Sequence, residues 1–427
     1  MVKFRWEKDF KETIFGEIPK DWEEKLIKEI GDVGGGSTPS TKVKEYWDGN
    51  VAWITPDDLA QHKFRYISHG KRNITEKGVR EHSLRIYPSR TVLLTSRAPI
   101  GYVAIAKNPV TTNQGFKNIV PNNETNSEYL YYLLKNIVEY LRDIAGGSTF
   151  SELTATTLRE VKAPFPSSKE QSLIAIVLSY FDSLIENRIM QDEILEKTAM
   201  AIFKSWFMDF EPFKDEEFIN SDIRKMPKTW QTKKIKEVGE VGGGSTPSTK
   251  NKEYWNGEVA WITPKDLADR YTDNFVYISK GERNITKKAV EECSLRLFPP
   301  NTVLLTSRAP IGYVAIAENY LTTNQGFKNI IPKDPVYCEF IYFFLKHNVE
   351  YLRDIAGGST FSEITAETLN EVELIIPPPP ILLRFHKLVN PLFQKILLNQ
   401  KEIMVLRRIR DVLLPLLVFG KLRVEEI

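Results

Sequence analysis

Two patterns of apolar and polar residues follow one another along the chain. Short apolar runs separated by turn residues, such as VAWIT, TVLLTS and YVAIA, predict β-strands. A single helical pattern over residues 128–144 comes next. After a proline-rich joint at 163–168, residues 169–210 contain neither glycine nor proline. This last segment predicts a helix of about forty residues, roughly 60 Å long.

The long segment carries apolar residues at alternating spacings of four and three, which is the pattern of a coiled-coil seam. Arg188 and Asp192 interrupt this stripe, and Asn399 and Arg410 interrupt a matching stripe near the end of the chain. A stripe this narrow favours a partner helix over packing on a globular domain alone, so we expect an antiparallel pair. The expected seam residues are Ile174, Leu178, Phe181, Ile185, Leu195, Ile202, Phe385, Val389, Leu392, Ile396, Ile403, Leu406 and Leu413.

The whole arrangement occurs twice. GGGSTPST at 34–41 returns at 242–249, LLTSRAPIGYVAIA at 93–106 returns at 304–317, and NQGFKNI and YLRDIAGGSTFSE also recur. A period of about 210 residues is too long for a solenoid repeat. We therefore predict an α+β fold with two repeated globular α/β domains, pseudo-twofold symmetric about an antiparallel coiled coil. The domains are expected at 13–163 and 220–374, and the helices at 167–211 and 378–424.

Composition narrows the functional classes. The chain of 427 residues has 58 Lys and Arg against 56 Asp and Glu. A net charge of +2 excludes a polybasic nucleic-acid binder, so any such site depends on local placement of charge. No run of 18 apolar residues and no signal-peptide pattern occurs, and two cysteines cannot form a disulfide framework. We expect a cytoplasmic protein without membrane contact.

No catalytic or metal-binding pattern stands out. Residues 34–42 lack the spacing of a phosphate loop, and the histidines of one copy have no counterpart in the other. No cluster has metal-ligand spacing. A hydrolase or methyltransferase of unfamiliar type would need acidic residues present in both copies. The carboxylate pairs to test for that reading are Glu152/Glu363 and Asp143/Asp354.

Four polar, turn-rich segments of each copy carry side chains that suit nucleic acid. Arg reads guanine, Asn or Gln reads adenine, and Ser, Thr and Lys contact phosphates, although each loop alone fits ordinary turn chemistry. Their repetition in both copies favours a binding surface. The candidate DNA contacts are Ser37, Thr38, Lys42, Ser96, Arg97, Asn113, Gln114, Lys117, Ser148, Thr149, Ser245, Thr246, Lys250, Ser307, Arg308, Asn324, Gln325, Lys328, Ser359 and Thr360.

The order of these segments resembles a known family. GGGSTP, EYW and AWITP, SRAPIG, NQG, a proline joint and a long helix that begins with Glu170 and Gln171 follow one another, all in two copies. This is similar to the specificity (S) subunit of type I restriction-modification enzymes, over about residues 13–424. The second copy departs from the pattern, because Ile381 and Leu382 replace Glu-Gln. Pro415 stands where the first copy has Lys204 and is expected to kink or end the second helix in its last turns.

The resemblance implies a non-catalytic subunit of a DNA-modifying complex. Each globular part would be a target recognition domain that reads one half of a bipartite site in double-stranded DNA. The helices would fix the half-site spacing and dock modification (methyltransferase) subunits, expected to be two, with restriction (translocase/nuclease) subunits joining through the complex. No cofactor is expected on this chain, because S-adenosylmethionine, ATP and Mg²⁺ would belong to the partner subunits.

The verbatim repetition of the loops goes further than the resemblance. It predicts that both domains read the same or nearly the same half-site, so that the target is an interrupted palindrome. Any asymmetry is expected in residues 61–72 against 269–283, and Arg97/Arg308 and Gln114/Gln325 are the expected base readers. About 60 Å of helix bounds the half-site separation at roughly 18 bp. The alternative is a scaffold that bridges two identical non-DNA partners.

Overall fold

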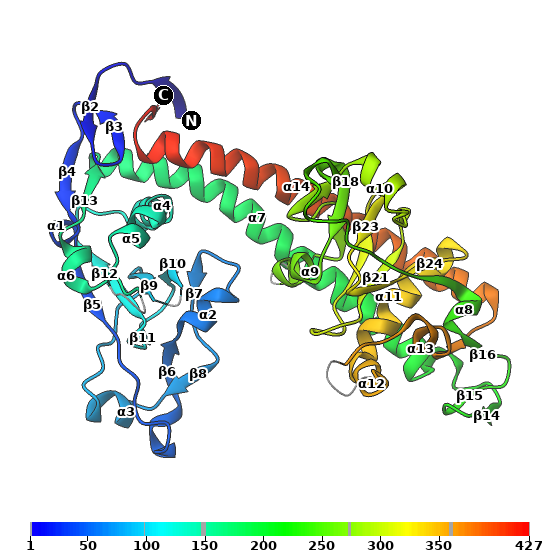
Figure 1. Cartoon of the computed structure of the whole chain (residues 1–427). Helices are drawn as coiled ribbons and strands as arrows, with labels where there is room; N and C mark the ends of the chain where they lie inside the picture. The colour runs from blue at the N-terminus through cyan, green and yellow to red at the C-terminus, as the bar shows by residue number, and fades with distance from the viewer. Residues whose placement is uncertain (1, 98, 147–150, 272–274, 358–361, 427) are drawn as a thin grey trace. The chain divides into compact units, whose positions relative to one another are not determined.

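The computed structural model describes residues 2–97, 99–146, 151–271, 275–357 and 362–426. The chain divides into two units, Met1–Glu186 with Ile403–Ile427 and Asn187–Glu402. Each unit contains one copy of the globular domain together with part of each long helix, and the two are described here one at a time (Figure 1). We call them unit 1 and unit 2.

The domain of unit 1 is built on a five-stranded sheet and a three-stranded sheet. Only the β7–β10 pair of the first sheet and the β6–β11 pair of the second are parallel. The first sheet has the order β5 (Gly31–Gly35), β12 (Phe116–Pro121), β9 (Val92–Ser96), β10 (Ile100–Ala106) and β7 (Tyr66–Ile67). The second has the order β11 (Val110–Thr112), β6 (Trp47–Ile54) and β8 (Arg72–Ile74).

Short strand pairs and helices complete unit 1. The hairpin β2 (Phe10–Thr13) and β3 (Gly16–Pro19) precedes β4 (Glu23–Leu26), which pairs with β13 (Lys162–Phe165) at the proline joint. The helices are α1 (Ile27–Ile30), the 3₁₀ turn η1 (Lys44–Tyr46), α2 (Pro56–Ala60), α3 (Glu76–Glu81), α4 (Ser127–Asn136), α5 (Val138–Asp143) and α6 (Ala155–Arg159). The helical pattern of 128–144 thus forms two helices that meet at Ile137.

Local sequence explains where several of these elements begin. After β6, Thr55 caps α2 through a hydrogen bond from the backbone N–H of Asp58, and Pro56 occupies the first helical position. Proline is favoured there because the first helical N–H has no partner within the helix. Thr75 and Thr154 cap α3 and α6 in the same way. The Thr-Pro pair of the AWITP motif therefore starts a helix directly after a buried strand.

Unit 2 repeats the two sheets. The five-stranded sheet has the order β17 (Gly239–Gly243), β24 (Phe327–Pro332), β21 (Val303–Thr306), β22 (Val314–Ala317) and β19 (Tyr277–Ile278), and the three-stranded sheet β20 (Arg283–Ile285), β18 (Trp255–Ile262) and β23 (Leu321–Thr323). The strand pairs are β14 (Phe218–Asn220) with β15 (Lys225–Pro227) and β16 (Gln231–Lys234) with β25 (Glu373–Ile376). The helices are α8 (Ile235–Val238), η4 (Lys252–Tyr254), α9 (Pro264–Tyr271), α10 (Lys287–Glu292), η5 (Pro335–Tyr337), α11 (Cys338–His347), α12 (Val349–Asp354) and α13 (Ala366–Asn370).

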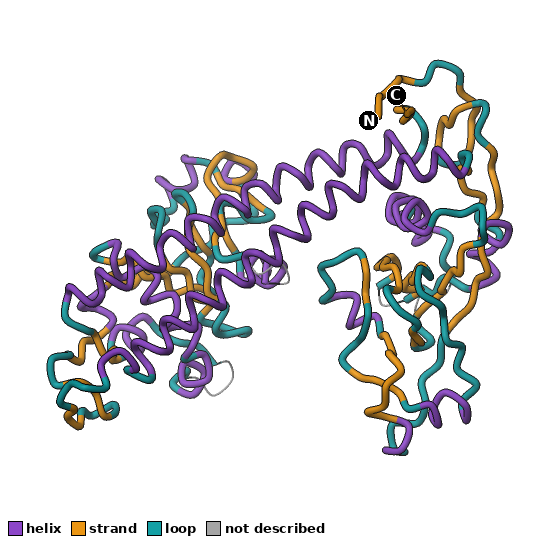
Figure 2. Tube along the Cα trace, turned by 180° about the vertical axis from the view of Figure 1, so that it is seen from behind, coloured by secondary structure: helices purple, strands orange, loops and turns teal. Residues whose placement is uncertain are grey.

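The two long helices are α7 (Ser168–Phe203) and α14 (Pro379–Val418), each an unbroken coil in Figure 2. A π-helical turn over Lys204–Met208 and a 3₁₀ turn, η3 (Glu211–Phe213), follow α7, so the predicted helical segment of 167–211 is α-helical only as far as Phe203. The second helix continues past Pro415 to Val418, so this proline lies in the last turn. Its predicted extension to 424 is wrong, since Leu422–Glu426 is a strand, β26.

Strand β26 pairs antiparallel with β1 (Val2–Trp6), so both ends of the chain belong to unit 1. Arg423 of β26 donates hydrogen bonds to the carboxylates of Glu7, Asp21 and Glu170. The indole of Trp22 donates to the same Glu170 at 3.0 Å. Glu170 therefore holds the start of α7 to the strand that follows α14. The domain start predicted from the sequence, residue 13, left out strand β1 and therefore the β1–β26 pair.

In unit 1, the start of α7 and the end of α14 pack against each other and against the domain. Ile174, Leu178 and Leu417 lie in one buried cluster with residues of α4. Inside the seam, Arg410 of α14 donates to the carboxylate of Asp182 of α7 at 2.6 Å. The arginine that interrupts the second stripe is thus one half of an interhelical ion pair.

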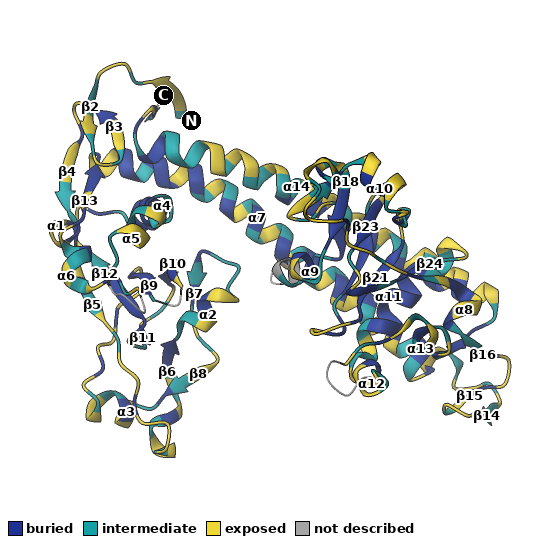
Figure 3. Ribbon diagram, in the orientation of Figure 1, coloured by how far each residue is buried: buried dark blue, intermediate teal, exposed yellow. Residues whose placement is uncertain are grey.

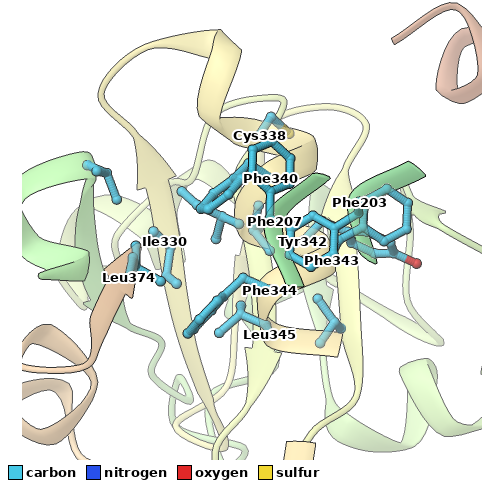
Figure 4. Close-up of a cluster of buried hydrophobic side chains, with 14 of the residues drawn as sticks. Phe203, Phe207, Ile330, Cys338, Phe340, Tyr342, Phe343, Phe344, Leu345 and Leu374 are labelled. Carbon is cyan, nitrogen blue, oxygen red and sulfur yellow. The ribbon is translucent and has the colours of Figure 1, made fainter. Parts of the chain in front are cut away.

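In unit 2, the end of α7 and the start of α14 form the equivalent antiparallel pair. Its buried cluster joins Phe203 and Phe207 with the aromatic residues of α11 (Figure 4). Phe385 of α14 packs against the same two rings. The Phe207 and Phe385 ring centroids lie 4.8 Å apart in an edge arrangement, which favours aromatic pairs. None of the thirteen predicted seam residues is exposed in either unit. The buried stripe of each helix is wider than a coiled-coil seam, since the helix also packs on its domain.

Polar residues interrupt the seam of unit 2 as well. Arg188 forms a forked ion pair with Glu402, with its Nε 2.7 Å from a carboxylate oxygen. The amide nitrogen of Asn399 donates to Asp192 Oδ1 at 2.7 Å, and both residues are buried. The second carboxylate oxygen of Asp192, Oδ2, and the amide oxygen of Asn399, Oδ1, have no hydrogen-bond partner among the described residues. Burial raises the pKa of Asp192 to about 7, although the Asn399 amide opposes this shift.

The raised pKa predicts how Asp192→Asn changes stability. In the unfolded chain the aspartate has a pKa of about 3.9, so the folded chain binds this proton more tightly. The stability that the protonated group contributes is present below about pH 4 and is lost as the pH rises to about 7. The amide introduced by the substitution does not titrate and supplies an N–H beside the unpaired Asn399 oxygen. The thermal midpoint of the variant, minus that of the wild type, should therefore increase between pH 4 and 7 and then level off. A constant or decreasing difference would contradict this account.

Candidate nucleic-acid interface

Three candidate loops of unit 1 and the residues that follow position 150 converge at one end of its two sheets. The Ser37 backbone N–H donates to Thr112 O at 3.0 Å, which joins the loop after β5 to the turn after β11. The Ser96 N–H donates to Gly115 O at 2.8 Å, and the Leu153 N–H donates to Ser96 O at 2.9 Å. The end of β9 therefore lies between the turn at 113–115 and the segment after residue 150. The structure brings together three of the four segments that the sequence marks as candidates, and residues 147–150 of the fourth lie outside the described residues.

Two tryptophans hold the first loop in place. The Trp53 indole donates to Ser37 O and the Trp47 indole to Ser40 O, both at 3.1 Å, and the two rings lie edge to face. Arg72 of β8 covers the other side of Trp47, 3.6 Å from its ring centroid. Because the indoles bind backbone carbonyls, they fix the path of the loop without using its hydroxyl groups. Ser37, Thr38, Ser40, Thr41 and Lys42 remain exposed.

Gln114 is attached to this loop by one of its two polar atoms. The Thr38 hydroxyl donates to Gln114 Oε1 at 2.5 Å, while the residue as a whole is exposed. The neighbouring Asn113 accepts the N–H of Gly115 in a tight turn. With its oxygen engaged, Gln114 presents its amide nitrogen, which is a donor only.

A charged cluster lies beneath the loops. Lys117 of β12 donates to Ser96 Oγ and to Glu152, both at 3.1 Å, and its side chain is 11% exposed. The second oxygen of Glu152 lies 3.7 Å from Arg97, whose side chain is 40% exposed. Glu152 thus neutralises the buried lysine and restrains the arginine that reaches the surface.

Unit 2 repeats these contacts. Thr246 donates to Gln325 at 2.5 Å, and the Trp261 and Trp255 indoles donate to Ser245 O and Ser248 O. Lys328 lies 2.9 Å from Glu363 and 3.4 Å from Ser307 Oγ, and Arg308 lies 2.9 Å from Glu363. Burial opposes ionisation of Glu363, but the hydrogen bonds from Lys328 and Arg308 outweigh it and lower its pKa. The two loop sets therefore share geometry as well as sequence.

The structure separates the sequence-predicted contacts into three groups. The exposed residues are Ser37, Thr38, Lys42, Arg97 and Gln114, with Ser245, Thr246, Lys250, Arg308 and Gln325 in unit 2, and Asn113 and Asn324 are partly exposed. Ser96, Lys117, Ser307 and Lys328 lie inside the loop framework and hold it together. Ser148, Thr149, Ser359 and Thr360 lie outside the described residues.

Sequence reasoning missed the residues that shape the loops. The tryptophan pairs lie in the repeated motifs EYW and AWITP and their arginines in the repeated RNIT, and that repetition was the available signal. Glu152 and Glu363 were candidates for catalysis, yet their carboxylates are engaged by lysine and arginine. Among the described residues, no group of three or more His, Cys, Asp or Glu could hold a metal ion. No helix in that same part of the chain is long and apolar enough to cross a membrane.

Comparison with known proteins identifies the family. A model described as the type I restriction modification DNA specificity domain matches twice, at residues 19–196 and 227–406. The chain belongs to this family. The type I restriction enzyme MjaIX specificity subunit of Methanocaldococcus jannaschii is 48% identical over 442 residues, covering 100% of this chain and 99% of that protein. The HindI specificity subunit of Haemophilus influenzae is 25% identical over 94% of this chain and 100% of that protein.

A solved structure has the same fold. The crystal structure of a type I restriction-modification S subunit from M. genitalium covers 93% of this chain and 96% of its own, with a TM-score of 0.58 at 19% identity. The repeated α/β domains with two long helices are therefore the architecture of specificity subunits. The protein is a DNA specificity subunit, non-catalytic, and this decides against the scaffold and the unfamiliar enzyme.

The role of Glu152 predicts the effect of Glu152→Gln and Glu363→Gln on DNA binding. Each substitution removes one negative charge from the loop framework and releases its arginine. Affinity for any DNA should rise at low salt, and the slope of log affinity against log salt should steepen by up to about 0.9 per substitution. Fluorescence anisotropy of the assembled complex over a salt series measures both. Glu160→Gln is the matched control. It makes the same charge change at a residue that pairs with Lys28 and lies outside the four loops. Equal behaviour of the loop variants and this control would contradict the role.

Proposed function

We propose that the two domains read the same or nearly the same DNA half-site, so that the full target is an interrupted palindrome. The observation that carries this proposal is the match between the two loop sets in sequence, hydrogen bonds and exposure. Loops that present the same side chains in the same geometry offer the same pattern of donors and acceptors to base edges. The antiparallel packing of α7 and α14 favours inverted over direct half-sites.

Within each half-site, we assign base reading to Arg97/Arg308 and Gln114/Gln325. Both arginines are partly exposed and restrained by a carboxylate, which reduces the conformational entropy that they lose on binding. The glutamines would donate to acceptors such as purine N7, because their oxygens are engaged by threonine. The exposed serines, threonines and lysines of the first loop would contact phosphates.

The two long helices would set the half-site spacing and dock modification subunits. Exposed positions recur along both helices (Figure 3), and several of them are large apolar residues. Contiguous exposed apolar residues mark interaction surfaces. They are Ile176, Tyr180, Val405, Ile409 and Val412 in unit 1, and Met190, Ile194, Leu383, Leu388 and Leu398 in unit 2. One such surface per unit supports two modification subunits, with the restriction subunits joining through them.

The chemistry of the complex would reside in the partners. S-adenosylmethionine would be bound by the modification subunits, and ATP and Mg²⁺ would serve the restriction subunits. This chain would contribute DNA recognition and assembly without a cofactor of its own. The bound of roughly 18 bp on half-site separation, from helix length, stays a prediction.

Co-expression with modification subunits, followed by genome-wide mapping of N6-methyladenine, tests the palindrome. The expected result is one bipartite motif with inverted, near-identical halves, on a complex that purifies with two modification subunits. A bipartite motif with unrelated halves would contradict the palindrome and leave the family function intact. A complex with a single modification subunit would contradict the expected stoichiometry.

The base-reading assignment predicts that Arg97→Ala relaxes specificity at one position of one half-site. Loss of a direct base contact costs about 1–3 kcal/mol, and Arg308→Ala should relax the corresponding position of the other half. Selection of bound sequences from randomised duplexes measures both effects. If Arg97→Ala weakens all sequences to the same extent, the arginine contacts a phosphate and the assignment is wrong.

A further inference from the structure

The two copies differ where each domain meets the long helices. Five positions of unit 1 form a polar network there, of which Arg65, Tyr132 and Asp182 are buried and Glu186 and Arg410 are partly buried. Arg65 and Tyr132 belong to the domain, Asp182 and Glu186 to α7, and Arg410 to α14. Asp182 is at its centre, with 5% of its surface exposed.

Each member of this network is bound to another. The Tyr132 hydroxyl donates to Asp182 Oδ2 at 2.7 Å, and Arg410 donates to Asp182 Oδ1 at 2.6 Å. Arg65 donates to the Tyr132 oxygen at 3.3 Å, and its backbone N–H donates to Glu186 at 2.6 Å. Its guanidinium also lies 3.8 Å from the second oxygen of Glu186. Two arginines and two carboxylates thus neutralise each other.

The equivalent positions of unit 2 are all apolar. At the constant offset of 211 residues that relates the two copies here, they are Val276, Phe343, Phe393, Leu397 and, for Arg410, Ala199. All five belong to, or pack against, one hydrophobic cluster. The pair Tyr132–Asp182 is replaced by Phe343–Phe393, whose ring centroids lie 5.4 Å apart in an edge arrangement. The same contact is therefore made by a hydrogen bond in one unit and by two aromatic rings in the other.

Combining the polar residues of unit 1 with the apolar residues of unit 2 across one domain–helix contact would destabilise the fold. A domain with Arg65 and Tyr132 placed against Phe393, Leu397 and Ala199 would bury a guanidinium with no carboxylate. A domain with Val276 and Phe343 placed against Asp182 and Glu186 would remove the hydroxyl and the guanidinium that stabilise those carboxylates. Removing one partner of a buried ion pair is far more destabilising than replacing the whole pair by apolar residues.

We propose that these five positions determine which domain docks on which end of the helix pair. Arg65 and Tyr132 fit only the surface of Asp182, Glu186 and Arg410, and Val276 and Phe343 fit only the surface of Phe393, Leu397 and Ala199. The two domains carry the same DNA-facing loops, yet they are not interchangeable.

The docking of the domains on the helices also explains some sequence differences between the two copies. Without it, these differences would suggest that the two domains read different DNA sequences. Arg65 and Val276 lie in the stretches 61–72 and 269–283, where the sequence analysis places any asymmetry between the two domains. Their side chains are buried, at 6% and 1% exposed, so neither is placed to read a base. Part of the asymmetry between the copies thus belongs to the helix contacts.

A full-length chain with two copies of the first domain tests the proposal. Residues 27–161 replace residues 235–372, a segment bounded by the same strand pair in both units, β4–β13 and β16–β25. The transplanted copy is made with and without R65V and Y132F. Without them the thermal midpoint should fall by about 10 °C, and with them most of the loss should be recovered. As the matched control, R65V and Y132F in the native first domain should lower the midpoint.

The proposal therefore requires the same two substitutions to stabilise at one position and destabilise at the other. An effect of the same sign at both positions would overturn it, as would a transplant as stable as the wild type without them.

A second experiment needs no transplant, so it decides the question even if the chimaera fails to fold. V276R with F343Y in the native chain should lower the midpoint of unfolding. Adding A199R, F393D and L397E should raise it again, because the polar set is then complete. A further decrease with all five substitutions would refute the proposal. The readout is thermal unfolding without DNA, so these results are independent of the palindrome.

Discussion

The structure depends on the burial of two long apolar stripes that no single segment can cover. Each unit joins the start of one helix to the end of the other, and its globular domain packs against further apolar residues of both helices. The core of unit 1 consequently combines residues near 174 with residues near 417, and strand β26 returns to pair with β1. Contacts this distant in sequence are what make each domain part of a larger unit instead of a separate module on a linker.

The same constraint explains how a nearly neutral protein can present the loop surface that we propose reads DNA. The loops are anchored from below by indole N–H groups on backbone carbonyls and by the Lys117–Glu152 pair, so their exposed side chains are left free to contact a partner. Charge is placed locally: the buried lysine is neutralised, and the arginine beside it reaches solvent. Modest net charge and a rigid loop framework fit a subunit that supplies specificity within a larger complex.

Sequence alone predicted the repeat, the fold class, the helix pair and the three converging segments that lie within the described residues, because apolar periodicity and verbatim repetition report directly on buried faces. It also marked Asp192, Asn399 and Arg410 as interruptions of the seam. Their partners, and the raised pKa of Asp192, depend on register and burial, which a single helix pattern does not contain. The β1–β26 pair, the break at Ile137 and the tryptophan anchors depend on tertiary contacts. The burial of Ser96 and Lys117 could not be predicted either. The alternation of residues along a strand does not show which face of the sheet the neighbouring loops cover.

We propose that the loops of both domains are alike because they read the same half-site, and that the buried contacts differ because the two domains dock on different helix surfaces. The most direct test is methylation by the assembled complex of synthetic duplexes that carry the mapped half-site as an inverted repeat, as a direct repeat, or beside an unrelated sequence. The account predicts efficient methylation of the inverted repeat and loss of methylation for the other two. Equal methylation of the inverted and direct repeats, or a requirement for two different half-sites, would contradict it.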